Sequence, residues 1–183
     1  MIKVSLVIST YNWKEALYLS LISVSRQTTL PYEVVVADDG SRKDTAEMLS
    51  QIKPHLPFQL KHVWQEDKGF QKTAIMNKAF ADCEGNYIIQ IDGDIILEKH
   101  FIADHISEAH EGYYIHGSRG KLSQKLTNKL LREKDYHFSF FTKGVRRKFN
   151  VFRCPLLTIL FHNYKKNKKE RGCNMAFWKK DVF

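Results

Sequence analysis

Short apolar runs alternate with stretches of helical periodicity through the first 120 residues, and this alternation constrains the fold most strongly. Runs such as "VSLVI" at 4–8 and "YEVVVA" at 32–37 are typical of strands that are buried on both faces. Between them, residues 14–26 repeat apolar side chains at helical spacing. Strands that alternate with helices indicate βαβ units, so we expect an α/β fold with a mostly parallel sheet and helices on both faces.

The same pattern predicts the remaining elements. Further strands are expected at 58–64, 86–91 and 112–117, and further helices at 43–52, 71–83 and 98–110. Residues 121–171 break the rhythm, with helices expected at 122–134 and 156–165, and "GCNMAFW" at 172–178 predicts a last strand. A chain of 183 residues favours one domain, so 1–183 is interpreted as a single domain with 121–171 as an insertion beside the sheet.

The positive charge of the chain is concentrated in this insertion. The net charge is +9, and residues 121–171 hold 15 of the 29 Lys and Arg residues but 3 of the 20 Asp and Glu residues. Such a block indicates an anionic partner: membrane lipid, acidic glycan or nucleic acid. Aromatic residues among the basic ones at 136–152 favour a membrane interface, with ordinary packing of the insertion as the alternative. Because no DNA- or RNA-binding motif is present, no nucleic acid partner is predicted.

Cysteine usage and hydropathy indicate the compartment. Cys83, Cys154 and Cys173 are odd in number and far apart, which argues against a disulfide framework and for a reducing cytosol. The N-terminal residues run directly into a strand pattern rather than a signal peptide. No apolar stretch reaches the roughly 18–20 residues that a spanning helix needs. We therefore expect a cytoplasmic protein.

Four polar clusters each follow the carboxyl end of a predicted strand, at 9–12, 38–41, 65–72 and 92–94. In an open α/β sheet, ligands bind in the crevice outside these strand ends. One such cluster is explained as well by turn chemistry or a helix N-cap. Four clusters on one edge of the sheet predict a binding site.

Asp92 and Asp94 stand on either side of Gly93 at the end of an apolar strand. Two carboxylates so close repel each other unless a positive group lies between them. Mg²⁺ and Mn²⁺ prefer carboxylate oxygens and usually share their shell with substrate phosphates. The triplet therefore predicts a divalent metal site, with a simple Asp-Gly turn as the alternative.

The motifs "SLVISTYNW", "VVVADDGS", "DKGFQK" and "IIQIDGD", in this order, resemble those of the family 2 glycosyltransferases of the GT-A fold. The resemblance covers residues 2–118, and "GCNMAFWKKD" at 172–181 is similar to the acceptor-side strand of the same enzymes. It implies a nucleotide-sugar-binding half at 1–120, the basic insertion at 121–171, and the truncated start of an acceptor half at 172–183. "DKGFQK" together with "GCNMAFWKKD" looks most similar to bacterial enzymes that build lipopolysaccharide or capsule.

The resemblance also implies roles for individual residues. Those that match its motifs divide among a nucleobase site, a phosphate and ribose site, a metal site and an acceptor side. Ser9, Tyr11 and Asp39 match nucleobase contacts, Asp38 a residue that orients the loop or reaches the ribose, Lys72 a basic residue near the diphosphate, Asp92 a ribose contact, Asp94 the ligand of Mn²⁺ or Mg²⁺, and Cys173 and Asn174 the acceptor side.

The activity that this implies is transfer of a sugar, with inversion, from a UDP-sugar to a glycan or lipid-linked acceptor in bacterial surface polysaccharide synthesis. Peripheral contact with the inner face of the membrane is expected through 136–169. The family's general base lies in a Trp-Gly-x-Glu-Asp stretch, which is expected beyond Phe183, so no catalytic residue is assigned. The alternative is therefore a catalytically incomplete fragment or subunit that binds a nucleotide sugar. Met76 stands where many members have arginine, which weakens the expected diphosphate contacts from that helix.

Other polar residues have two interpretations each. Glu66 and Asp67 could form an acid/base pair or belong to an ordinary loop. Arg119 could approach an anionic acceptor or lie on the surface. His116 could be a ligand or an ordinary histidine at a strand end, and His62 is interpreted as structural or exposed.

Overall fold

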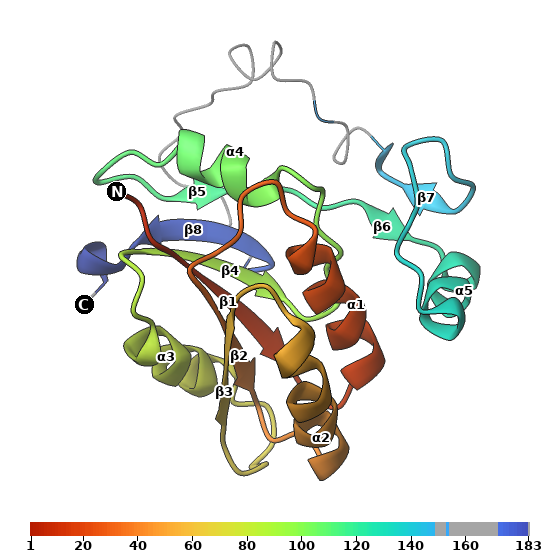
Figure 1. Ribbon diagram of the computed structural model, residues 1–183, viewed down its shortest axis with the longest axis horizontal. Helices are drawn as coiled ribbons and strands as arrows, with labels where there is room; N and C mark the ends of the chain where they lie inside the picture. The colour runs from red at the N-terminus through yellow and green to blue at the C-terminus, as the bar shows by residue number, and fades with distance from the viewer. Residues whose placement is uncertain (149–152, 154–171, 183) are drawn as a thin grey trace.

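The computed structural model describes residues 1–148, 153 and 172–182, and its centre is a six-stranded sheet (Figure 1). The strand order is β3-β2-β1-β4-β8-β5. Their bounds are β1 (Val4–Thr10), β2 (Glu33–Asp38), β3 (Gln59–Trp64), β4 (Tyr87–Asp92), β5 (Ile115–His116) and β8 (Asn174–Trp178). The first four are parallel to one another, and β8 is antiparallel to both β4 and β5. The predicted α/β class and mostly parallel sheet are confirmed.

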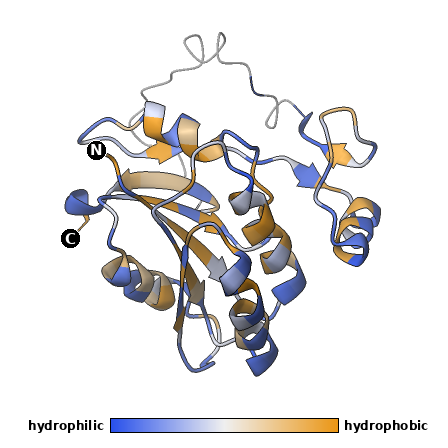
Figure 2. Ribbon diagram, in the orientation of Figure 1, coloured by the Kyte–Doolittle hydropathy of each residue, from blue (hydrophilic) through white to orange (hydrophobic). Residues whose placement is uncertain are grey.

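Helices cover both faces of this sheet. On one face lie α1 (Lys14–Ser25), α2 (Lys43–Ile52) and α4 (Phe101–Ser107), and on the other lies α3 (Lys72–Asp82). Side chains alternate along a strand, so Leu6 and Ile8 of β1 enter the first core while Val7 enters the second. Figure 2 shows the result, with apolar strands inside and polar outer helix surfaces. Short 3-10 helices follow α2 (η1, Lys53–His55) and β8 (η3, Lys179–Asp181).

Two sequence expectations were wrong in detail. The strand expected at 112–117 has only two residues, Ile115 and His116, which pair with β8. The helix expected at 98–110 begins only at Phe101. The preceding residues form a turn instead, because the carbonyls of Glu98 and Lys99 accept hydrogen bonds from the Gln27 side chain (2.7 Å) and the Thr28 backbone (2.8 Å).

Residues 121–148 form a small unit beside α1, which we call the basic lobe (Figure 1). It contains α5 (Gln124–Glu133) and the paired strands β6 (Lys121–Leu122) and β7 (Val145–Arg146). Leu126, Leu130 and Val145 pack with Leu19 of α1 in a third apolar cluster. The helix expected at 122–134 is confirmed, and the one expected at 156–165 lies outside the described residues. Within the described ranges, no helix is both long enough and apolar enough to cross a bilayer.

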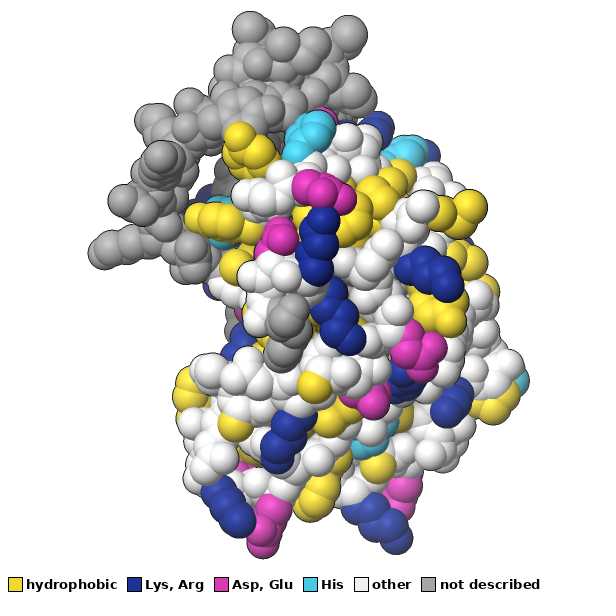
Figure 3. Space-filling model, turned by 90° about the vertical axis from the view of Figure 1, so that its left-hand side faces the viewer, with side chains coloured by type: hydrophobic (Ala, Val, Ile, Leu, Met, Phe, Trp, Pro, Cys, Tyr) yellow, Lys and Arg dark blue, Asp and Glu magenta, His cyan; other side chains and the backbone are white. Residues whose placement is uncertain are grey.

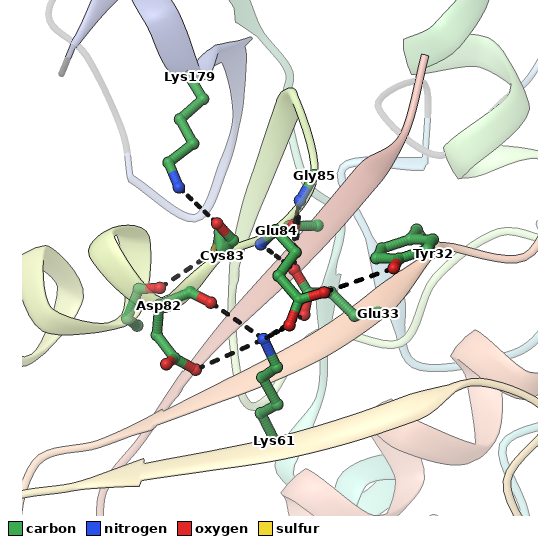
Figure 4. Close-up of polar contacts among 10 residues, drawn as sticks. Tyr32, Glu33, Lys61, Asp82, Cys83, Glu84, Gly85 and Lys179 are labelled. Atoms are coloured by element: carbon green, nitrogen blue, oxygen red, sulfur yellow. Dashed lines mark hydrogen bonds and ion pairs between the residues drawn. The ribbon is translucent and has the colours of Figure 1, made fainter. Parts of the chain in front are cut away.

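A buried ionic network holds the amino-terminal edge of the sheet (Figure 4). The fully buried Glu33 carboxylate accepts hydrogen bonds from Ser5 Oγ and from the Glu84 backbone N–H, both at 2.6 Å, and lies 2.9 Å from Lys61 Nζ. Burial alone would raise the pKa of Glu33, but these hydrogen bonds outweigh burial and hold it below its ordinary value. The network joins β1, β2 and β3 to the turn between α3 and β4.

Candidate functional site

A pocket of about 340 Å³ lies at the opposite end of the strands, where their carboxyl ends meet. The parallel strand order runs 3-2-1-4, so the chain direction across the sheet reverses between β1 and β4, and crevices form at such a reversal. There Ser9 of β1 is the register partner of Asp92 of β4. The predicted residues Ser9, Tyr11, Asp39, Lys72, Asp92 and Asp94 all line the pocket. The structure thus brings six of the nine predicted site residues together.

Asp92 is neutralised by two cations from distant parts of the chain. Lys72, the first residue of α3, places its Nζ 2.5 Å from Asp92 Oδ1. Arg119, from the segment after β5, donates from Nη1 to Asp92 Oδ2 at 3.3 Å. The Ser9 hydroxyl adds a long hydrogen bond of 3.4 Å. Of the two interpretations given for Arg119, the structure supports a place in the site.

Asp94 has the opposite environment. No described residue other than its own backbone donates a hydrogen bond to its carboxylate. The Asp94 side chain is in contact with solvent, but the walls of the pocket displace much of the water that would otherwise surround it. Desolvation first, and the charge of Asp92 second, raise the pKa of Asp94 above its ordinary value. A bound cation would relieve both effects.

Gly93 is required by a close approach of the backbone. Its N–H donates to the Ser9 carbonyl at 2.8 Å, and a Cβ at position 93 would lie 2.8 Å from that same oxygen. The glycine therefore lets β1 and the end of β4 approach each other between the two carboxylates. A side chain here would push Asp92 and Asp94 away from the pocket.

The chemistry around Asp94 fits a hard divalent cation that is only partly held by protein. Among the described residues there is no group of three or more His, Cys, Asp or Glu side chains arranged to hold a metal. Asp94 offers carboxylate oxygens, and Mg²⁺ or Mn²⁺ at such sites takes further oxygens from substrate phosphates and water. The site therefore suits a metal that arrives with a diphosphate.

Asp38 and Asp39 hold the loops that surround the pocket. Both oxygens of the fully buried Asp38 are occupied, by the Ser41 backbone N–H (2.8 Å) and by His62 Nε2 (2.9 Å). Asp38 does not line the pocket, so of its two expected roles the geometry supports loop orientation. Asp39 accepts from Gln65 Nε2 at 2.6 Å and from the Gln71 backbone N–H at 2.9 Å.

Aromatic side chains form the outer wall of the pocket. Tyr11 is about half exposed, and its hydroxyl donates to Asp67 Oδ2 at 2.9 Å. Trp13 and Phe70 also line the pocket, with exposed fractions of 43% and 90%. Asp67 therefore orients Tyr11 through this contact, while Glu66 lies 3.1 Å from Lys68. Neither acid lines the pocket, so the geometry gives no support to an acid/base pair there.

A larger hollow of about 1790 Å³ adjoins the pocket, and Cys173 and Asn174 line it. The described walls of the two cavities share two residues, Trp13 and Asp94. A molecule in the pocket can therefore meet a molecule in the hollow at Asp94. This is the arrangement that a two-substrate transfer requires.

His105 of α4 was not among the sequence predictions, and it fixes the position of Asn174. Its Nε2 lies 3.0 Å from Asn174 Oδ1, and burial lowers its pKa to about 4. The imidazole is therefore neutral at physiological pH, so it donates from Nε2 to the amide oxygen. The sequence gave no signal of this role, because His105 is a single histidine in a helix and its partner Asn174 lies 69 residues further along the chain.

Other site residues also escaped the sequence patterns. Trp13 and Phe70 are single aromatic residues in polar clusters, and only their neighbourhood in space shows that they form one wall. The chain separation of 27 residues between Arg119 and Asp92 hides their contact. His62 contacts Asp38, in agreement with the structural role expected for it.

Taken together, the fold and this site define a GT-A type of α/β protein with a pocket lined by three aspartates and one lysine at the strand reversal. The model of the family "Glycosyl transferase family 2" matches residues 5–168. The chain belongs to this family, as its motifs indicated.

Curated relatives are similar over part of their length. The uncharacterized glycosyltransferase YfnE of Bacillus subtilis is 36% identical over 110 residues, which is 60% of this chain and 27% of that protein. Chondroitin synthase of Escherichia coli is 36% identical over 50% of this chain and 13% of its own length. An undecaprenyl-phosphate 4-deoxy-4-formamido-L-arabinose transferase of Photorhabdus laumondii is 29% identical over 84% of this chain and 48% of its own length. The chain thus spans less than half the length of these relatives.

Solved structures confirm the fold. A mannosyltransferase of Pyrobaculum calidifontis, solved with GDP-Man and Mn²⁺, superposes with a TM-score of 0.57 at 20% identity, over 64% of this chain and 36% of that one. Glucosyl-3-phosphoglycerate synthase of Mycobacterium tuberculosis, solved with Mn²⁺ and UDP, gives a TM-score of 0.54 at 14% identity, over 98% and 57%.

Proposed function

We propose that the chain binds a UDP-sugar in the smaller pocket and transfers its sugar, with inversion, to a glycan or lipid-linked acceptor in the larger hollow. One observation carries this proposal. At the strand reversal, Asp92 is neutralised by Lys72 and Arg119, whereas the neighbouring Asp94 faces the pocket with a raised pKa. A divalent cation that arrives with a diphosphate would supply the positive partner that the Asp94 carboxylate lacks among the described residues.

The residues around the pocket support a division of roles. The ring of Tyr11 offers a face for the nucleobase, and Ser9 and Asp39 offer hydrogen-bonding groups beside it. Lys72 lies near the diphosphate, and Asp92 reaches the ribose. Asp38 acts indirectly, because it fixes the turn at Ser41.

Asp94 is the proposed ligand of Mn²⁺ or Mg²⁺. Both structural neighbours described above were solved with Mn²⁺, and the carboxylate chemistry here fits either ion. When bound, the cation would neutralise the diphosphate and favour its departure as a leaving group. Lys72, 2.5 Å from Asp92, places a second positive charge on the same side of the pocket.

The acceptor side is supported by the hollow next to Asp94. Cys173 and Asn174 line it, and His105 holds the Asn174 amide in place. Inversion requires a single displacement, with a general base on the acceptor side, and no such base is assigned among the described residues. The similarity to a chondroitin synthase and to an undecaprenyl-phosphate 4-deoxy-4-formamido-L-arabinose transferase supports an acceptor in surface polysaccharide synthesis.

Calorimetry with UDP in the presence and absence of Mn²⁺ tests the donor site. We expect metal-dependent UDP binding by the wild type, and loss of the metal dependence in Asp94→Ala. Equal binding of UDP by both proteins, with no effect of Mn²⁺, would contradict the assignment. Consumption of UDP-sugars by the 183-residue chain then separates an active transferase from the alternative, a fragment or subunit that binds the donor without turnover.

A further inference from the structure

We propose that the basic lobe, residues 121–148, docks on an anionic lipid bilayer with the side chain of Phe141 inserted between the headgroups. The bilayer would then be the surface on which the proposed transferase works, and residues 121–148 would be the part of the chain that contacts it. The inference rests on the proposed function only where it concerns the acceptor. Vesicle binding is measured without nucleotide, so its failure and the failure of the donor site are distinguishable.

The lobe carries a strong and local excess of positive charge. Residues 121–148 contain nine Lys and Arg but two Asp and Glu, whereas residues 1–120 contain 12 and 16. Eight of the nine cationic side chains are exposed. Within the described part of the chain, no acidic side chain forms an ion pair with Lys125, Lys143, Arg146 or Arg147. This charge is therefore available to anionic headgroups.

The lobe also exposes a large apolar side chain among these cations. Phe141 is 85% exposed, and it contacts Phe140 edge-on with ring centroids 5.3 Å apart. Lys148 lies over the Phe140 ring at 5.5 Å. Apolar rings with Lys and Arg around them are typical of surfaces that lie in the membrane interface.

The two aromatic neighbours Phe140 and Phe141 have different surroundings. Phe140 lines the larger hollow, together with Phe138 and the aliphatic residues Leu122 and Leu131, whereas Phe141 is not part of that wall. The lobe is thus at once a wall of the hollow and a cationic outer surface. Docking through Phe141 would place the lobe, and with it one wall of the hollow, at the bilayer that carries a lipid-linked acceptor.

Among residues 1–120 and 172–182, the other ranges that the structure describes, this combination of a local cationic excess and an exposed Phe side chain is not found. The side that carries both chain ends shows Lys and Arg side chains interspersed with Asp and Glu (Figure 3). Phe70 is exposed to a similar degree, at 90%, but it lies beside the donor pocket. The aliphatic wall behind Phe140 favours a bilayer over RNA, because stacking on bases does not need such a wall.

Co-sedimentation with vesicles tests the charge. We expect the chain to bind vesicles that contain phosphatidylglycerol and not vesicles of phosphatidylcholine alone, with affinity that falls as salt rises. Arg146→Glu with Arg147→Glu should weaken binding by about fivefold or more for each reversed charge. The matched control is Lys43→Glu with Lys53→Glu, which changes the net charge equally on exposed positions of α2 and η1 and should leave most of the binding intact.

Phe141 supplies a second test that does not depend on net charge. Phe141→Ala should weaken binding to the anionic vesicles by about tenfold, whereas Phe70→Ala, with similar exposure, should not. Adding vesicles should shift the tryptophan emission of Phe141→Trp to shorter wavelength. The wild type, which lacks a tryptophan at position 141, should show a smaller shift. Since residue 141 is exposed, these variants should keep the circular dichroism spectrum of the wild type.

Three outcomes of the binding measurements would overturn the inference, and a fourth comes from fluorescence. They are equal binding to both kinds of vesicle, equal losses from the lobe variants and their controls, and retention on single-stranded RNA without retention on anionic vesicles. The Phe141→Trp spectrum distinguishes insertion from adsorption, since unchanged emission on binding would contradict insertion.

Discussion

The two ends of the central strands hold carboxylates in opposite states. At the amino-terminal edge, Glu33 is fully buried, accepts several hydrogen bonds and faces Lys61, so its pKa is lowered. At the carboxyl-terminal edge, Asp94 receives no hydrogen bond from another described residue, and its pKa is raised. A buried carboxylate that is hydrogen-bonded and paired with a cation contributes to stability. A carboxylate without hydrogen-bond donors or a cation beside it is available to bind a ligand. The same four parallel strands therefore support the fold at one edge and the site at the other.

Removing the cation at the amino-terminal edge should have the largest effect on stability. Lys61→Met leaves Glu33 buried without its counter-charge, and we expect a loss of about 3 kcal/mol in the free energy of unfolding. Urea denaturation measures this change. Lys53→Met, on the exposed surface of η1, is the control and should change little. A loss as small as that of the control would show that the network does not hold the edge.

Acid should separate the two carboxylates by the sign of their effects. The lowered pKa of Glu33 contributes stability that is fully present above its unfolded pKa of about 4.3 and is lost as pH falls through the folded pKa. The raised pKa of Asp94 has the reverse sign, so its ionisation opposes folding as pH rises through the folded value.

Urea denaturation at a series of pH values checks this contrast. Asp94→Asn should be at least as stable as the wild type at neutral pH, and Glu33→Gln should be less stable. The difference between wild type and Glu33→Gln should shrink in acid. If Asp94→Asn were the less stable variant, Asp94 would be a structural residue.

Replacing Trp13 should have a smaller effect, and it should change the binding of a UDP-sugar more than the binding of UDP. Because it lines both the pocket and the hollow, we expect it to contact the sugar where donor and acceptor meet. Trp13→Ala should weaken binding of the preferred UDP-sugar by about three- to tenfold, with little change for UDP. Trp13→Phe should recover most of this loss. Calorimetry with both ligands is the measurement, and equal losses for UDP and UDP-sugar would assign Trp13 to the nucleotide instead.

Much of the fold was predictable because its signals are local. The apolar run of β1 and the helical spacing of α1 each indicate their own structure, and parallel strands bring their carboxyl ends to one edge. The place of β8 between β4 and β5 was not predictable, because strand order depends on long-range packing rather than on composition. The same holds for β5, whose two residues pair with a strand about 60 positions later.

The site was predictable where one motif holds the chemistry. Asp92 and Asp94 belong to one triplet, and the structure brings them to the predicted pocket. Contacts between motifs were not predictable. Arg119 reaches Asp92 from the segment after β5, and Asp38 uses both oxygens for the loop, which its sequence context left open.

Asp94 is proposed to bind a divalent cation together with a nucleotide diphosphate, and Mn²⁺ electron paramagnetic resonance measures this binding. The signal of free aqueous Mn²⁺ should fall when wild-type protein and UDP are both present, and by much less with protein alone or with UDP alone. Asp94→Asn should abolish this joint effect, whereas Glu33→Gln, which changes the opposite edge, should retain it while folded. An unchanged Mn²⁺ signal with wild-type protein and UDP, or an identical decrease with Asp94→Asn, would contradict the account.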